Sequence, residues 1–271
     1  MAGTDARTLL QAGRLAEAVA AQQAVVKAQP LDAGGRYLLF GLLCFAGEWD
    51  RAARQLDVLV HQDPQLTTSA GVYGGLLAAE RRRVAVFGGE EAPLLPPDAP
   101  AHAVARQAAL IAWRGGDAAE AGRRLEAAVA AQPALDGRLD GREFAGLRDL
   151  DDLLGSVLEV FAGGRYLWLP FERIRRLTID EPGHLLDLLW LPARLEGSDG
   201  ETAAVHLPVL YAGSAAAPDE QLRLGRQTDW QDEGPFFRGL GQRLLACAGH
   251  DGEEREAGLL AVRSLEFGPA A

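Results

Sequence analysis

Histidines and cysteines are the side chains whose spacing most often reveals an active site, and in this chain they are scattered. No HExxH motif occurs, and no histidine stands at zinc-ligand spacing from a cysteine. We therefore expect each histidine to be a surface or loop residue. The five are His61, His102, His184, His206 and His250. The two cysteines, Cys44 and Cys247, lie in apolar stretches and are expected to pack in the core.

Other patterns approach functional motifs without matching them. Residues 239–241 begin a dinucleotide-binding pattern, but Leu244 stands where its third glycine is required. No GxSxG elbow is present. Asp149, Asp151 and Asp152 cluster without the spacing of a calcium loop, which predicts a solvated acidic linker between two domains. The sequence thus predicts a non-enzyme without metal or cofactor; catalytic groups that meet only in the folded β-rich half stay an open alternative.

Composition narrows the class of protein. The 271 residues are 48% apolar and 24% charged, as in globular proteins, and the apolar runs are too short to span a bilayer. The net charge of −11 argues against a nucleic-acid partner. The N-terminus shows no basic region followed by an apolar core, so no signal peptide is expected. We expect a cytoplasmic protein that binds neither nucleic acid nor a membrane.

The elements that must position any site begin with a helical repeat. Gly13 and Gly47 are each followed five residues later by alanine and seventeen residues later by proline, and the pattern returns at Gly116. The offset of 34 residues between the first two copies is the tetratricopeptide period. Residues 65–86 are expected to form one long helix, and residues 81–83, three arginines, its solvated face. Residues 1–135 are therefore predicted to be a tetratricopeptide-like α-helical domain.

The second half changes period and predicts a mostly antiparallel β-rich domain over residues 136–271, so the fold class is α+β. Residues 157–162 and 165–169 flank a Gly-Gly turn and form the first hairpin. Residues 188–195 and 202–210 form a second hairpin. A third is predicted between residues 241–247 and 259–267, around an acidic loop at 251–256. Residues 219–226 suggest a short helix.

Two groups of residues are candidates for binding a partner. Stacked helical hairpins form a concave groove suited to a helix or peptide. The candidates beside the inner helices of that groove are Arg36, Tyr37, Phe40 and Tyr73, although core packing explains Tyr37 and Phe40 equally well. Tryptophan and arginine are also frequent in binding hot spots, and the second half contains several. The candidates there are Trp168, Arg173, Trp190, Arg226 and Trp230, with ordinary core and rim packing as the alternative.

Several blocks resemble the ImpE/TagJ family of type VI secretion accessory proteins. They are RYLLFGLLCFAGEWDRA at 36–52, VLEV at 157–160, GRYLWLPFERI at 164–174, DLLWLPA at 187–193, LRLGRQTDW at 222–230 and GLGQR at 239–243. They occur in order along nearly the whole chain. The chain departs from the family at residues 144–149, where FAGLRD replaces a tryptophan-containing block.

The resemblance implies an adaptor rather than an enzyme. Family members are expected to contact the N-terminal helix of the small subunit of the contractile sheath and, in some systems, to assist the AAA+ ATPase that disassembles the sheath. The resemblance leaves open which of the two domains receives the helix. The alternative is a general tetratricopeptide adaptor or chaperone that binds a different peptide.

Overall fold

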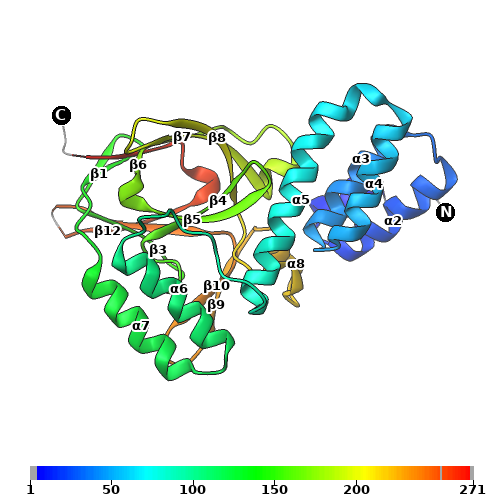
Figure 1. Ribbon diagram of the computed structural model, residues 1–271. Helices are drawn as coiled ribbons and strands as arrows, with labels where there is room; N and C mark the ends of the chain where they lie inside the picture. Colours follow the sequence, from blue (N-terminus) through cyan, green and yellow to red (C-terminus); the bar gives the residue numbers. More distant parts are fainter. Residues whose placement is uncertain (1–4, 251, 269–271) are drawn as a thin grey trace.

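The computed structural model describes residues 5–250 and 252–268, and it begins with helices packed in antiparallel pairs (Figure 1). Gly13 and Gly47 link the helices of two pairs with φ of +77° and +72°, a left-handed conformation that glycine adopts without strain. The predicted helical repeat and the predicted long helix are both confirmed. The helices are α1 (Ala6–Gln11), α2 (Leu15–Ala28), α3 (Ala33–Phe45), α4 (Trp49–Gln62) and α5 (Thr67–Gly88), with a short 3-10 turn, η1 (Pro64–Leu66), before α5.

The arginines of α5 divide between solvent and core. Arg81 and Arg82 are exposed, whereas Arg83 is buried at 4% exposure. The prediction that all three form a solvated face was wrong for Arg83, because successive residues of a helix point about 100° apart and Arg83 points to the packed side, where it bonds to Glu159. None of the helices in the described ranges is both long and apolar enough to cross a membrane.

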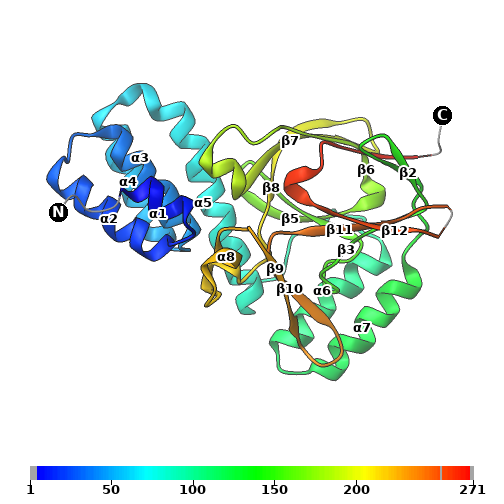
Figure 2. The ribbon, with the colours of Figure 1, turned by 180° about the vertical axis from the view of Figure 1, so that it is seen from behind.

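A second helical hairpin lies beside the β-rich part of the molecule, apart from α1 to α4 (Figures 1 and 2). It consists of α6 (Ala101–Arg114) and α7 (Ala118–Ala131), and it contains the third copy of the glycine landmark, Gly116, at φ +85°. The domain boundary expected between residues 135 and 136 falls directly after this hairpin and stays a prediction.

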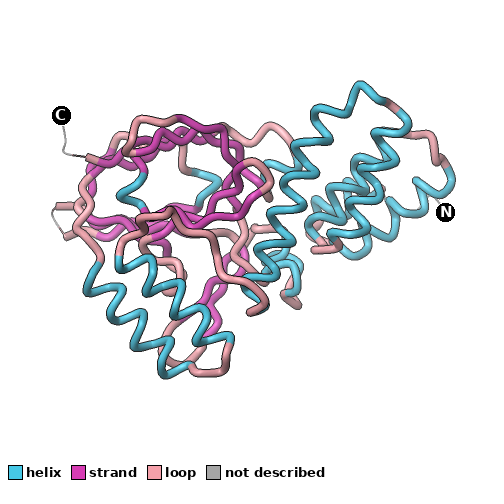
Figure 3. The backbone as a smooth tube through the Cα atoms, viewed as in Figure 1, coloured by secondary structure: helices cyan, strands magenta, loops and turns pink. Residues whose placement is uncertain are grey.

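The strands form an eight-stranded antiparallel sheet, which curls round on itself in Figure 3, and two smaller sheets. The order in the large sheet is β2-β1-β13-β6-β7-β8-β4-β5, and the smaller sheets are β12-β11-β3 and β10-β9. The α+β fold class is confirmed. The strands are β1 (Gly137–Leu139), β2 (Arg142–Phe144), β3 (Gly146–Asp149), β4 (Val157–Ala162), β5 (Arg165–Pro170), β6 (Ile174–Ile179), β7 (Trp190–Gly197), β8 (Thr202–Pro208), β9 (Thr228–Asp232), β10 (Phe237–Gly241), β11 (Leu244–Ala248), β12 (Glu254–Gly258) and β13 (Ser264–Phe267).

Two of the three predicted hairpins are confirmed. Strands β4 and β5 pair across Gly163 and Gly164, both at positive φ, as a tight two-residue turn requires. Strands β7 and β8 form the second hairpin. The third was wrong: β11 pairs with β12, inside the supposed acidic loop, and β13 joins β1 and β6 in the large sheet. The local pattern could not reveal the place of β13, because its pairings with β1 and β6 are long-range, whereas β11 and β12 form a local hairpin.

The segment after β8 returns to the helical repeats and closes their ends (Figure 2). The carboxylate of Glu220, in the confirmed short helix α8 (Glu220–Arg223), accepts the backbone N–H groups of the first two residues of α2 at 3.1 and 2.7 Å. Arg226 donates to the carbonyl groups of the last two residues of α1 at 2.8 and 3.0 Å. One continuous apolar core joins the helices and the large sheet, running from Ala6 to Leu265.

Removing the cap on α2 should lower stability. We expect Glu220→Ala to cost about 1 kcal/mol, because two helix N–H groups lose their acceptor. For a chain of this size the melting temperature should fall by about 2–4 °C, measured by circular dichroism. The matched control is Glu181→Ala at an exposed position. Equal melting of the two variants would show that the contact contributes nothing to stability.

Candidate interaction site and buried charge network

Glu159 is a fully buried carboxylate in β4 and the centre of a charge network. Arg83 of α5 donates two hydrogen bonds to the carboxylate of Glu159, both 2.8 Å long. Arg243 and the hydroxyl of Tyr166 donate to it as well. Burial raises the pKa of Glu159, but the two guanidinium groups outweigh burial and hold the pKa at about 2. Glu159 therefore stays ionised between two arginines from opposite parts of the chain.

The network continues into the acidic segment after β3. Arg243 donates at 2.6 Å to Asp149, which also accepts the hydroxyl of Tyr211 at 2.9 Å. Asp151 accepts the Nε–H of Arg238 at 2.8 Å. Asp149 and Asp151 are both buried, so the prediction of a solvated acidic linker was wrong. Their charges are compensated by arginines 94 and 87 residues away, which sequence spacing does not show.

A hydrogen-bonded chain of serine, histidine and glutamate lies on the side of α6. The hydroxyl of Ser156 is 2.8 Å from Nδ1 of His102, whose Nε2 is 2.6 Å from Glu172. His102 is buried at 1% exposure, so its predicted surface position was wrong. Ser156 is fully buried and its Oγ accepts the Nε–H of Arg106 at 2.9 Å. The hydroxyl of Ser156 is therefore shielded from solvent. Its hydrogen bonds to His102 and Arg106 hold α6 against the residue that precedes β4.

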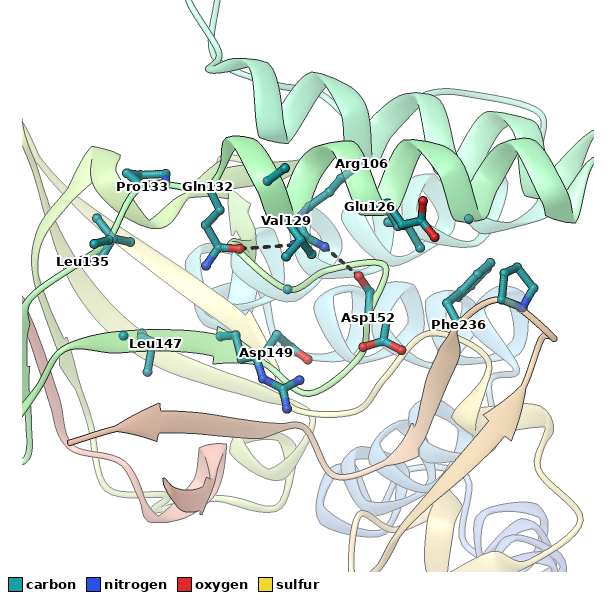
Figure 4. A pocket seen from close by; sticks show the side chains of 18 residues that line it. Arg106, Glu126, Val129, Gln132, Pro133, Leu135, Leu147, Asp149, Asp152 and Phe236 are labelled. Atoms are coloured by element: carbon teal, nitrogen blue, oxygen red, sulfur yellow. Dashed lines mark hydrogen bonds between the residues drawn. The ribbon is translucent and has the colours of Figure 1, made fainter. Parts of the chain in front are cut away.

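A cavity of about 920 Å³ lies between α7 and β3 (Figure 4). Its walls are mainly apolar: Leu125 and Val129 come from α7, Leu147 from β3, and Phe236 closes one end. His102 and Ser156 are not among the lining residues. No group of three histidine, cysteine or acidic side chains placed to hold a metal occurs in the described ranges.

Arg106 forms the polar floor of this cavity. Its guanidinium donates at 2.6 Å to the carbonyl of Asp152 and reaches Gln132 at 3.4 Å, as Figure 4 shows. No carboxylate in the described ranges lies within ion-pair distance of it, and burial lowers its pKa to about 10. Arg148, on the rim, is exposed and also makes no ion pair within those ranges. The charges of Asp149, Asp151 and Asp152 oppose the effect of burial on Arg106, so the exposed Arg148 is the cation that this cavity offers to a partner. An apolar trough with an arginine at its rim suits an amphipathic segment that carries a carboxylate.

The predicted residues of the helical groove gather at its inner face. Tyr37 and Tyr73 join their hydroxyl groups at 2.8 Å, and Phe40 packs edge-on to Tyr73 with ring centroids 5.5 Å apart. Phe40 is fully buried. Arg36 is buried too and donates at 2.7 Å to Gln55 of α4. The structure thus brings Tyr37, Phe40 and Tyr73 together as packing between α3 and α5, whereas Arg36 bonds to Gln55 of α4 and to the carbonyl of Pro30.

The concave face of the helices is occupied by the chain itself. The short turn η3 (Leu185–Leu188) of the β-rich part lies against α3 so closely that a Cβ at Gly41 would be 3.2 Å from Leu185. What remains is a cavity of about 220 Å³ beside Tyr73 and Leu186. That space is too small to hold a helix.

The candidates from the second half lie apart from one another. Trp168 and Trp190 are core residues with at most 1% exposure. Arg173 forms an ion pair with Asp98, and Arg226 holds the end of α1. Trp230, on β9, is 38% exposed. Of this group only Trp230 presents a free face that a partner could contact.

Sequence reasoning missed the cavity residues and the network. Leu125 and Val129 of α7 have the ordinary spacing of a helix that packs in a core. Their spacing therefore did not show that they line a cavity. Glu159 did carry a signal, because it interrupts the otherwise apolar strand VLEVFA. A buried carboxylate is stable only beside a group of opposite charge. The sequence therefore predicts a buried arginine near Glu159, but it does not show which arginine.

Glu159→Gln should be strongly destabilising. The amide keeps the shape of the side chain, but Arg83 and Arg243 lose the charge between them. We expect the free energy of unfolding in urea to fall by about 3–5 kcal/mol. Glu201→Gln, at an exposed position beside β8, serves as the control. A loss below about 1 kcal/mol would contradict the role given to Glu159.

Asp149 should make stability depend on pH. Burial raises its pKa from 3.8 to about 6 despite Arg243, so the native state keeps a proton that the unfolded state releases near pH 4. Its contribution to stability therefore falls as pH rises from about 4 to 6. The wild type should lose stability over that range relative to Asp149→Asn, measured by urea unfolding at several pH values. Parallel curves for the two proteins would refute this assignment.

Comparison with known proteins places the chain in a family. The ImpE protein family model matches residues 141–266, and a tetratricopeptide repeat model matches residues 9–78. The type VI secretion system accessory component TagJ of Pseudomonas aeruginosa is 39% identical over 267 residues, which cover 97% of this chain and 91% of TagJ. A crystal structure of a Vibrio parahaemolyticus protein shares the fold, with a TM-score of 0.88, 22% identity and 98% coverage of both chains. The chain belongs to the ImpE/TagJ family.

Proposed function

We propose that this chain is a non-enzymatic, cytoplasmic accessory component of a type VI secretion system, and that it binds the N-terminal helix of the small sheath subunit. The identity with TagJ over nearly the whole chain supports the secretion role. The helical repeats support a protein partner. Assistance to the AAA+ ATPase that disassembles the sheath is part of the same proposal, because an adaptor held on the sheath could present it to that enzyme.

The observation that carries the helix-binding proposal is the open cavity between α7 and β3. An amphipathic helix buries one apolar stripe, and the cavity offers apolar side chains along one helix and one strand. Val129 is 64% exposed and lines this cavity, so a helix lying in the cavity would cover its side chain. The concave face of the repeats, by contrast, is filled by η3.

Charge specifies which helix fits. Arg148 is exposed on the rim and forms no ion pair with any described residue, so a helix with an acidic residue beside its apolar stripe is complementary to that edge of the cavity. Glu126, on the opposite wall, favours a basic residue at the other edge of that helix. A helix of mixed charge with one apolar stripe therefore fits best.

The experiment is calorimetric titration of the full chain with a peptide of the first helix of the cognate small sheath subunit, beside a scrambled peptide. We expect the true peptide alone to bind at micromolar concentration or tighter. Val129→Glu should weaken binding at least tenfold, about 1.4 kcal/mol, because it places a charge on the apolar wall.

Two control variants separate the surfaces. Ile111→Glu changes an aliphatic residue on α6 that is 54% exposed and lies outside the cavity, and it should leave binding unchanged. Tyr73→Ala tests the concave face of the repeats. Loss of binding in Tyr73→Ala but not in Val129→Glu would move the site to that face. Binding of neither peptide, together with binding of an acidic C-terminal peptide that amidation abolishes, would favour the general tetratricopeptide adaptor.

A further inference from the structure

A second cavity, about 500 Å³, lies where the helical repeats meet the β-rich part. Its walls are nearly all apolar. Phe45 ends α3, Trp49 begins α4, Val84 and Phe87 come from α5, and alanines 215 and 216 come from the 3-10 turn η4 (Ser214–Ala216). Two charged side chains line it, Glu80 and Arg83 of α5.

The two charges in this cavity are not equivalent. Arg83 already donates two hydrogen bonds to Glu159 and one of 2.7 Å to the carbonyl of Leu210. Glu80 is nine-tenths buried, with a side-chain exposure of 9%. Its Oε1 accepts the indole N–H of Trp190 at 3.0 Å and lies 3.7 Å from Arg83. Its Oε2 accepts no hydrogen bond from any described residue.

The surroundings of Glu80 hold an excess negative charge. The connected network contains three carboxylates, Glu80, Glu159 and Asp149, and two guanidinium groups, Arg83 and Arg243. Glu159 and Asp149 each contact an arginine within hydrogen-bonding distance, whereas Arg83 lies 3.7 Å from Glu80. Burial raises the pKa of Glu80, although the charge of Arg83 and the Trp190 hydrogen bond oppose that effect, so a further cation would favour its ionised form.

We infer that this cavity is a docking site for a lysine side chain of a protein partner, with Glu80 as the counter-ion. The walls would cover the four methylene groups of lysine, and the ammonium would reach the free Oε2. Because Trp190 occupies Oε1, Glu80 offers one oxygen, which suits the point charge of an ammonium better than the two-pronged guanidinium of arginine. Val84 is 54% exposed at the rim, where the partner's backbone would rest.

The site is distinct from the α7 cavity, so the inference does not depend on the helix-binding proposal. The probes are Nα-acetyl-lysine methylamide and its norleucine analogue, which differ only in the terminal ammonium. Binding is followed by the indole N–H resonance of Trp190 in nitrogen-15 NMR spectra, assigned with Trp190→Phe. We expect a saturable shift, with the lysine probe binding at least tenfold more tightly than the norleucine probe.

Glu80→Gln should abolish that preference, because the amide keeps the Trp190 hydrogen bond but not the charge. Glu181→Gln, which removes an exposed carboxylate that lines neither of these two cavities, should retain it. Thermal unfolding of both variants confirms that they fold. Equal binding of the two probes, binding of neither, or an unchanged preference in Glu80→Gln would each overturn the inference. Tighter binding of free n-butylammonium than of the blocked lysine would exclude a residue flanked by peptide bonds and so overturn the assignment to a protein.

Discussion

The pairing of Glu159 with Arg83 and Arg243 is the constraint on which the rest of the structure depends. A carboxylate buried inside a sheet is stable only if both guanidinium groups reach it at once. One is on α5, the last helix of the repeats, and the other precedes β11. The helix, the large sheet and the three-stranded sheet must therefore meet in a single arrangement. Hydrophobic burial alone would tolerate small shifts between them, whereas a buried charge without its partner would not.

Because α5 takes part in this network, it packs both with the helical repeats and with the large sheet. Its arginines at 81 and 82 face solvent like those of any repeat helix, while Glu80 and Arg83 point into the boundary with the sheet. The docking of α5 brings η3 onto the concave face of α3 and the α8 segment onto the ends of α1 and α2. The groove that isolated repeats would offer to a peptide is thereby used for internal packing. The open cavities instead lie on either side of the network.

The sequence predicts what is local and misses what is long-range. The glycine and proline landmarks and the Gly163-Gly164 turn determine the helices and the first hairpin, because each acts within a few residues. The sequence predicted a solvated linker at Asp149 and Asp151, because the arginines that bind these two buried acids lie 94 and 87 residues away in the chain. The place of β13 beside β1 and β6 was missed for the same reason. Trp168 and Trp190 matched the composition of a binding surface, yet tryptophan fills cores as readily, and only burial separates the two roles.

A buried ion network contributes more to a unique arrangement than to stability, since the cost of dehydrating the charges offsets much of their attraction. Such a unique arrangement suits an adaptor. A partner that binds surfaces already held in place loses less entropy in ordering them, so more of the contact energy appears as affinity. Arg106, on the floor of the α7 cavity, donates a hydrogen bond to the same acidic segment that Arg243 and Arg238 hold. The charges that join the two parts of the molecule thus also help to hold the cavity between α7 and β3 in shape.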